Sequence, residues 1–197
     1  MTRPDIDRPL RLSGVLPLLF FLSRFSEYIK VATPSHILWN CHVSNLMLGL
    51  GLVFQIPILI RIAAFWLILG IPPWIIDMFV IRIFTPVAFF SHVGGFLVAI
   101  FAVSQIGIGR RSWVYALIWH LAWQQVTRFV TPPIYNVNIA FRPYKGFEKL
   151  FSGYWDYWLA AAVLAGVCLW ILEVILRAIF PRPKKAPSAD LVDTPTN

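Results

Sequence analysis

Six long apolar runs follow one another along the chain, separated by short polar or proline-containing breaks. An α-helix rises 1.5 Å per residue, so about 20 apolar residues cross the hydrocarbon core of a bilayer. Each run is near this length, although Pro72 and Pro73 interrupt the third and predict a broken or shallow helix there. The pattern predicts an all-α, polytopic membrane helix bundle of about six transmembrane helices. The expected runs are Leu12–Ile29, His36–Phe54, Ile58–Ile76, Pro86–Gly109, Trp113–Val130 and Tyr157–Phe180.

The composition supports the same class. Of the 197 residues, 58% are hydrophobic and 13% are charged, and the mean hydropathy is +0.71. A soluble domain carries about 25% charged residues, so the composition indicates an integral membrane protein. We expect one membrane-embedded domain over residues 1–183. A disordered cytoplasmic tail rich in Pro, Ser, Asp and Thr is expected over residues 184–197.

The net charge of +8 comes from basic residues that lie mostly between or just beyond the apolar runs. This placement is typical of headgroup anchoring and argues against a nucleic-acid partner. With six helices, ten Lys and Arg residues share the side of both termini and five lie on the other side, which predicts cytoplasmic termini. The ten are Arg3, Arg8, Arg11, Arg61, Arg110, Arg111, Arg177, Arg182, Lys184 and Lys185; the five are Lys30, Arg82, Arg142, Lys145 and Lys149.

A cluster of polar side chains opens the second run. Asn40, Cys41, His42, Ser44 and Asn45 fall within six residues of an otherwise apolar segment. On a helix, the cysteine, the serine and the second asparagine share one stripe. Because polar groups are costly in hydrocarbon, this stripe should face protein or a wet cavity. The alternative is that these residues only join helices through hydrogen bonds.

Cys41 and His92 are expected at the same depth in the membrane. Each lies about six residues inside the start of its run, and both runs start on the non-cytoplasmic side. At 1.5 Å per residue, both lie roughly 9 Å below that interface. A thiol and an imidazole within about 3 to 4 Å could act together in catalysis. The alternative is that His92 is a packing histidine bonded to a backbone carbonyl, with Cys41 a buried helix-packing residue.

Other polar residues are expected near the same end of the bundle. The fifth run carries a stripe of polar residues that includes His120, Gln124 and Arg128, and the loop after it contains Asn136 and Asn138. We expect these residues, together with Asn40, Ser44 and Asn45, to bind substrate or orient the catalytic pair. The basic residues of the loop should contact lipid headgroups beside an aromatic cluster. These are Arg142, Lys145 and Lys149, beside Tyr154, Trp155 and Trp158.

No metal or other cofactor is predicted. The four histidines have no metal-ligand spacing, and the two cysteines, Cys41 and Cys168, lie inside apolar runs without a Cys-x-x-Cys pair.

Several features occur in a distinctive order along the chain. A cysteine lies early in one run, an apolar run rich in Phe and Trp follows, and a histidine opens the next. An Asn-x-Asn loop then precedes an Arg-Pro pair and an aromatic start to the last run. In chain order these are Cys41, Ala64–Gly70, Phe90–Gly94, Trp119, Asn136-Val137-Asn138 and Arg142-Pro143.

This order resembles the YwaF-like integral membrane proteins of bacteria and the related animal transmembrane cysteine acyltransferase of ether-phospholipid remodelling. The resemblance covers about residues 20–180. It implies that Cys41 is the acyl-accepting cysteine, that His92 is the family's histidine and that the protein lies in a bacterial inner membrane. The chain departs from the family pattern at Trp39, where the family has a histidine, and at His42, where it has an acidic residue.

Two functions remain as alternatives at this point. One is a lipid acyltransferase or acyl hydrolase that uses a Cys-His pair in an intramembrane pocket, with membrane lipids (phospholipid or another acyl lipid) as partners. The other is a non-catalytic small transporter or scaffold with a polar intramembrane site. The pattern of residues predicts no particular oligomeric state.

Overall fold

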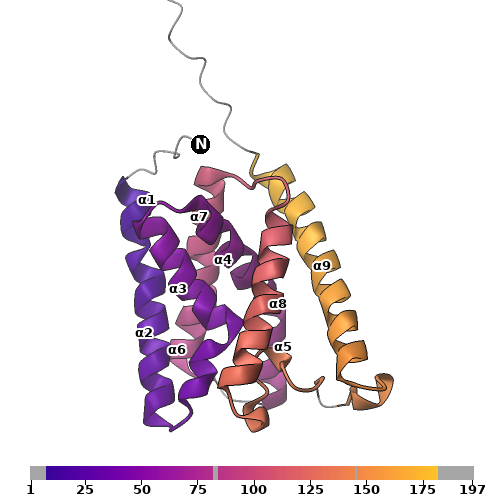
Figure 1. Ribbon diagram of the computed structural model, residues 1–197. Coiled ribbons are helices and arrows are strands. Elements are labelled where there is room, and N and C mark those ends of the chain that lie inside the picture. Colours follow the sequence, from indigo (N-terminus) through magenta and orange to yellow (C-terminus); the bar gives the residue numbers. More distant parts are fainter. Residues whose placement is uncertain (1–7, 82–83, 145, 182–197) are drawn as a thin grey trace, which may run out of the picture.

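The computed structural model describes residues 8–81, 84–144 and 146–181, and in this part of the chain it is entirely helical. The prediction of an all-α fold is confirmed. Six helical segments run alternately up and down between two ends of a bundle, and both ends of the described chain lie at the same end (Figure 1). The segments are α1–α2 (Arg8–Ser13, Val15–Lys30), α3 (Asn40–Val53), α4–α5 (Pro57–Leu69, Ile71–Ile81), α6–η2–α7 (Pro86–Phe89, Phe90–Gly94, Gly95–Ile106), α8 (Ser112–Val130) and α9 (Tyr154–Ile179).

Short 3-10 turns fill the connections at the end of the bundle opposite the termini. They are η1 (Pro34–Leu38), η3 (Pro133–Tyr135), η4 (Val137–Ile139) and η5 (Glu148–Leu150). The expected tail at 184–197 lies outside the described residues, as do Arg82 and Lys145.

Four of the six segments are long and apolar enough to cross a membrane. They are Arg8–Lys30, Pro57–Phe79, Pro86–Ile106 and Tyr154–Ile179. The segment expected to be broken at Pro72 and Pro73 is among them. The two prolines lie in the first turn of α5, where a helix tolerates proline because the first N–H groups have no partner within the helix. Gly70 before them keeps right-handed helical dihedrals, so the break between α4 and α5 is local.

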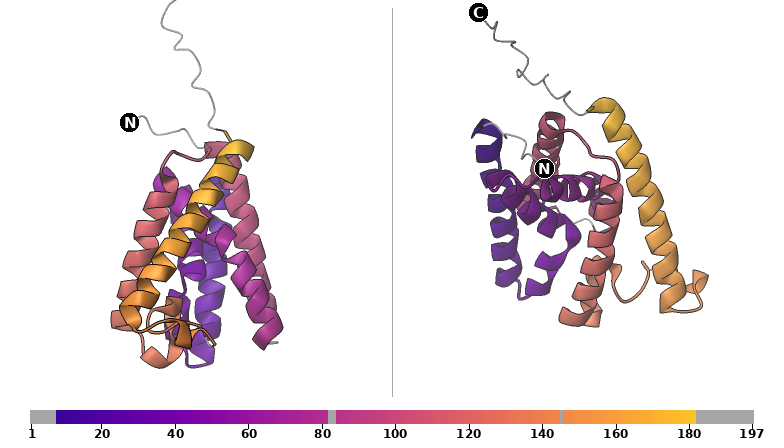
Figure 2. Two further views of the ribbon diagram at one scale, coloured as in Figure 1. Left: turned by 90° about the vertical axis from the view of Figure 1, so that its right-hand side faces the viewer. Right: turned by 45° about the horizontal axis from the view of Figure 1, so that its top comes forward.

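Helix α3 occupies the centre of the bundle. Ten of its 14 residues are buried, and it packs against α2 on one side and α4 on the other. The approach of α2 depends on glycines, because a Cβ added to Gly49 would lie 2.5 Å from Leu18 Cγ and 2.8 Å from the Gly14 carbonyl oxygen. Helix α9, by contrast, crosses one face of the bundle at a tilt and contacts mainly α8 (Figure 2).

Candidate functional site: a buried polar cluster around Cys41 and His92

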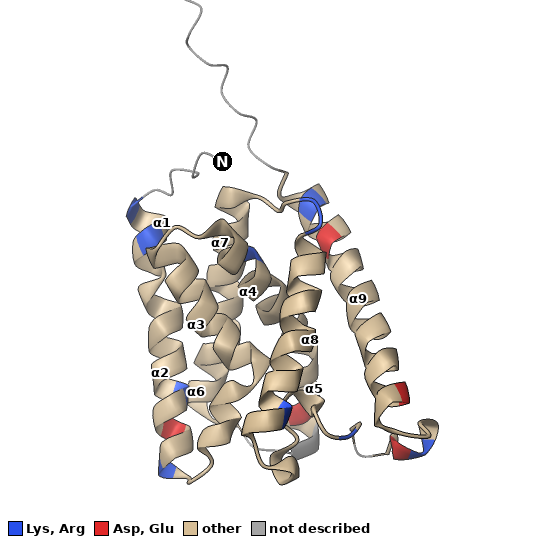
Figure 3. Cartoon of the chain, viewed as in Figure 1, with Lys and Arg blue, Asp and Glu red and all other residues tan. Residues whose placement is uncertain are grey.

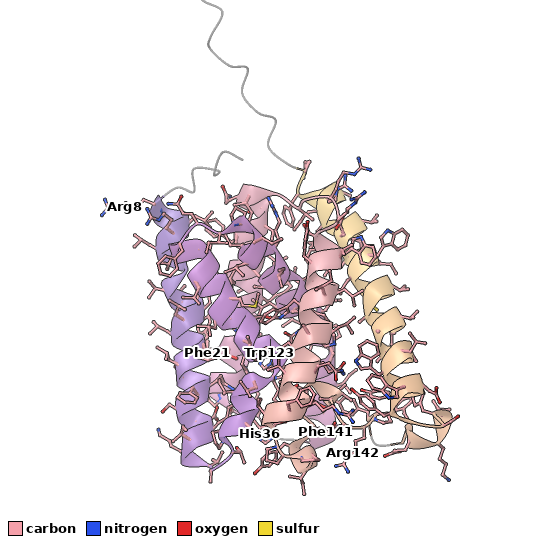
Figure 4. The ribbon with its side chains drawn as sticks, viewed as in Figure 1. Arg8, Phe21, His36, Trp123, Phe141 and Arg142 are labelled. Atoms are coloured by element: carbon pink, nitrogen blue, oxygen red, sulfur yellow. The ribbon has the colours of Figure 1, made fainter. Side chains whose placement is uncertain are left out.

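A polar cluster fills the region where α2, α3, α5 and η2 approach one another. Figure 4 shows His36, just before α3, and Arg142 at one end of the bundle, with Arg8 at the other. The cluster begins on α2, where the buried Arg24 pairs with Glu27 and donates to the hydroxyl of Tyr28. A buried arginine is tolerated in a membrane-embedded helix when partners of this kind satisfy it.

His42 links α2 to η2. Its Nε2 lies 3.0 Å from the Tyr28 hydroxyl, and its ring meets the ring of His92 edge to face, with 5.6 Å between the centroids. The residue is 2% exposed. Two imidazoles, a phenol and a guanidinium therefore form one continuous chain of polar groups, in which Tyr28 is half-buried.

His92 is held in a defined orientation by its own segment and by α5. Its Nδ1 lies 2.9 Å from the Ala88 carbonyl oxygen, which can only accept, so in the neutral ring Nδ1 carries the proton and Nε2 the lone pair. The indole of Trp74 stacks on the imidazole at 4.8 Å and 7°. The backbone around His92 is π-helical over Phe90–Gly94, an irregularity that often marks functional sites.

Cys41 lies near the break between α4 and α5. The residue is half-buried, and a Cβ added to Gly70 would lie 3.8 Å from Cys41 Cβ. Across the described residues, no hydrogen bond joins the thiol to His92; the α3 side chain that reaches this ring is His42. Successive residues of an α-helix point about 100° apart, so with His42 against His92 the Cys41 side chain leaves α3 in another direction. The expected direct pairing of thiol and imidazole stays a prediction.

Asn45 links α3 to η2 through two hydrogen bonds. Its Nδ2 donates to the Cys41 carbonyl at 3.2 Å and to the Ser91 carbonyl at 3.2 Å. The amide therefore bridges the backbone of α3 to the residue before His92. The contact is close, because a Cβ added to Gly95 would lie 2.4 Å from Asn45 Oδ1.

Several buried polar atoms in this region have no hydrogen-bond partner in the described part of the chain. Eight such atoms occur there in all, and five belong to the first turns of α3 or to Ser91. An unpaired buried polar atom costs free energy, so this group of atoms calls for hydrogen-bond partners from outside the described part of the chain. The five are Asn40 Nδ2, His42 Nδ1, Ser44 Oγ, Asn45 Oδ1 and Ser91 Oγ.

Asn138 fixes the start of α3 from a loop about a hundred residues away. Its Oδ1 accepts the Asn40 backbone N–H at 2.7 Å, and its Nδ2 donates to the Leu38 carbonyl at 2.9 Å. Gln124 in turn donates to the Asn138 carbonyl at 3.1 Å. The residue has a left-handed backbone, φ 54°, which asparagine tolerates better than most residues. Asn138 and Gln124 thus hold the cysteine-bearing helix in place.

The other residues expected at the site have separate partners. The indole of Trp119 donates to Asn40 Oδ1 at 3.1 Å, and His120 stacks on Trp66 with 4.2 Å between the ring centroids. Asn136 closes a turn of its own loop by accepting from the backbone N–H of Phe141 at 3.0 Å. None of these described contacts reaches His92, so a role for His120, Gln124 or Asn136 in orienting it stays a prediction.

The loop between α8 and α9 carries aromatic and basic side chains at the end of the bundle where α3 begins. The Arg128 guanidinium lies 3.6 Å from the centroid of the Tyr154 ring, and Arg142 and Lys149 are exposed. Tyr144 reaches α5, where its hydroxyl lies 3.3 Å from both carboxylate oxygens of Asp77. Burial, reinforced by this carboxylate, raises the pKa of Tyr144 to about 12. The loop is thereby tied to the helix next to Cys41.

No group of three or more His, Cys, Asp or Glu residues arranged to hold a metal ion occurs among the described residues.

Sequence reasoning missed His42 as the partner of His92 and Asn138 as the brace of α3. The adjacent Cys41-His42 pair was a signal for the first, because either residue could face the histidine. An asparagine in a loop, a residue type that favours left-handed turns and helix caps, was a signal for the second.

Comparison of the chain with models of known protein families, with curated proteins and with solved structures found no match.

Proposed function

We propose that all six helical segments are embedded in a membrane, with both termini in the cytoplasm and, following the resemblance above, in a bacterial inner membrane. Four segments support this by length and composition. The shorter α3 and α8 run beside them between the same two ends (Figure 1). Most charged residues gather at those two ends, with few between them, as a hydrocarbon core requires (Figure 3).

A reporter that works only outside the cytoplasm tests this topology. Alkaline phosphatase fused after Asn197 should be inactive, and the same enzyme inserted at Gly153, between α8 and α9, should be active. An active C-terminal fusion would contradict the proposed orientation.

We further propose that the polar cluster carries out acyl transfer or acyl hydrolysis on a membrane phospholipid, with Cys41 as the nucleophile. The observation that carries this proposal is the group of unpaired buried polar atoms around a partly exposed thiol. The ester and phosphate oxygens of a lipid are acceptors, and Asn40 Nδ2 and the hydroxyls of Ser44 and Ser91 can donate to them. The resemblance to a cysteine acyltransferase family supports the same assignment of Cys41 and His92.

In the proposed reaction, His92 Nε2 takes the thiol proton as Cys41 rotates toward it. The thiolate attacks the ester carbonyl, a C–S bond forms, and the C–O bond to the glycerol oxygen breaks. The leaving alkoxide receives the proton from His92. An acceptor alcohol or water then attacks the thioester, its proton passes through the same imidazole, and the thiol is restored. Asn40 Nδ2, which is unpaired and lies beside Cys41 in the chain, is the amide donor available to the oxyanion.

The test is whether an acyl group is trapped on Cys41. The purified protein is incubated with phosphatidylcholine vesicles whose acyl chains carry an alkyne. A label that hydroxylamine removes should appear on Cys41 and disappear in Cys41→Ala. Cys168→Ala is the matched control and should keep the label. A wild-type protein without label on Cys41, or with equal label on Cys168, would contradict the enzyme proposal.

A second candidate is a non-catalytic polar site in a small transporter or scaffold. It is favoured by the bond from His92 Nδ1 to the Ala88 carbonyl and by the bond between His42 and Tyr28, which satisfy these side chains within the protein. This candidate predicts that Cys41→Ala changes neither folding nor lipid labelling. It also predicts that Tyr28→Phe, which leaves His42 Nε2 unpaired, destabilises the bundle.

A further inference from the structure

An open groove of about 510 Å³ runs between α8 and α9, near the end of the bundle that holds the termini. Its lining is almost wholly apolar and includes Leu117 from α8 and Ala162 and Gly166 from α9. At Gly166 the two helices lie close together, because an added Cβ would be 3.4 Å from Leu117 Cδ2. In Figure 1 the two helices diverge toward the opposite end of the bundle.

The groove faces outward, toward the surroundings of the bundle. Val163 and Trp170, which line it, are 59% and 54% exposed. In a membrane these side chains meet lipid tails. Trp113 and Trp170 line the groove toward the end nearest the arginines, where tryptophan is typical of the boundary between hydrocarbon and headgroups.

Cationic side chains lie beyond the tryptophans. Arg177 follows Trp170 by seven residues, so it lies on the same face of α9 about 10 Å further along. Arg110 and Arg111 come directly before α8, and both are exposed. Among the described residues, no hydrogen bond, ion pair or ring contact involves the guanidinium groups of Arg110 and Arg111. The three arginines therefore face the headgroup layer above one apolar groove.

Glu173 does not neutralise this group of arginines. Its carboxylate is buried and accepts the backbone N–H groups of Arg111 and Trp113, each at 3.0 Å, so it is engaged at the start of α8. Its contact with Arg177 is longer, 3.7 Å. Three positive charges and one negative charge leave the region with a net charge of +2. Glu173 also fixes the distance between the arginines on the two helices, because it binds one helix to the other.

We propose that this groove binds one acyl chain of an anionic phospholipid whose phosphate contacts Arg110, Arg111 and Arg177. The apolar volume fits a lipid chain, and the cations complement a phosphate at the depth where the chain would end. This site lies at the opposite end of the bundle from Cys41, so it is independent of the proposed acyl transfer. It tethers α9, which otherwise contacts mainly α8, to the lipid layer on the side of the termini.

Native mass spectrometry of the full-length protein in detergent tests this proposal, with phosphatidylglycerol and phosphatidylcholine offered separately. The wild type should retain one phosphatidylglycerol and little phosphatidylcholine. Arg110→Gln with Arg111→Gln should weaken retention by about tenfold or more, because each basic residue contributes to anionic-lipid affinity. The matched control is Arg8→Gln with Arg11→Gln, which removes the same charge at the same end of the bundle and should leave retention unchanged (Figure 3).

Variants that fill the groove distinguish binding of an acyl chain from electrostatic attraction of the headgroup to the arginines. Gly166→Leu should abolish retention of phosphatidylglycerol with all three arginines present, and Ala162→Leu provides a second test if the first variant fails to fold. Equal retention of both lipids by the wild type, or unchanged retention in the folded filled variant, would overturn the proposal. So would a dimer that dissociates when the groove is filled, since the occupant would then be a second copy of the chain.

Discussion

Helix α3 buries most of its residues, whereas helix α9 leaves most of its residues, many of them hydrophobic, at least partly exposed. Helix α3 has 14 residues and buries ten of them, including Asn40, His42, Ser44 and Asn45. Helix α9 has 26 residues and buries five. Its exposed residues, such as Leu164 and Val174, are large and apolar. The strongest hydropathy signal therefore marks a helix with a largely exposed surface, whereas the polar chemistry lies in a helix packed between α2 and α4.

The largest expected difference between the two helices is in packing. Leu48 on α3 is fully buried, so Leu48→Ala should leave a cavity and lower the free energy of unfolding by about 2–4 kcal/mol. Leu164 on α9 is 65% exposed, and Leu164→Ala should change it by less than about 0.5 kcal/mol. Reversible unfolding in mixed micelles measures both values. Equal losses for the two variants would contradict the central position of α3.

The close approach of α2 and α3 should be nearly as sensitive. Gly49→Ala places a Cβ against Leu18 and the Gly14 carbonyl, so overpacking should lower the free energy of unfolding by about 1–3 kcal/mol. Gly153→Ala, at the start of α9, is the control, because an added Cβ there would meet no atom within 4 Å. Thermal unfolding of both variants in one detergent compares them. A silent Gly49→Ala would mean that the two helices are further apart.

Loss of the hydrogen bonds from Asn138 to the start of α3 should lower the free energy of unfolding by a smaller amount. Asn138→Ala removes the acceptor for the Asn40 N–H and the donor for the Leu38 carbonyl, so unfolding should become easier by about 1–2 kcal/mol. Asn138→Asp keeps the acceptor and should lose only part of this. Hydrogen exchange of the first turn of α3 measures the change locally. An unchanged exchange rate there in Asn138→Ala would show that the cap does not hold the helix.

How much the sequence predicts differs between these elements. The starts and ends of the apolar runs predict all six helical segments, because hydrophobic length is a local property. The rotation of α3 about its own axis, by contrast, depends on residues far away in the sequence. Whether Cys41 or His42 faces η2 depends on how α2 and α4 pack against α3, and a shift of one residue exchanges the two side chains. The partner of Asn40 lies 98 positions away, and no periodicity in either segment links it to Asn138.

The smallest predicted effect concerns the contact between the loop and α5. The pKa of Tyr144 is raised from its usual 10.0 to about 12, first by burial and then by Asp77. Because the folded state holds the phenol proton more tightly, the stabilisation is complete below pH 10 and is lost as the pH rises from 10 to 12. Tyr144 is 46% exposed, so solvent screening keeps this contribution below about 1 kcal/mol.

Tyr144→Phe should reduce the dependence of the free energy of unfolding on pH between 10 and 12. The ultraviolet titration of the variant should lack one phenol that titrates with a midpoint near 12 in the wild type. A midpoint for Tyr144 near 10 would contradict the contact with Asp77.

The two cysteines provide the most direct test of the central claim, because one lies on α3 and the other on α9, and both are partly exposed. The measurement is the rate at which a membrane-permeant maleimide alkylates each thiol in vesicles, followed by mass spectrometry of the two peptides. If the polar cluster activates Cys41 through His92, Cys41 should react at least about tenfold faster than Cys168, and His92→Gln should remove most of the difference. If Cys168 reacts as fast as Cys41, or if His92→Gln leaves both rates unchanged, the cluster does not activate the thiol and the proposed reaction is wrong.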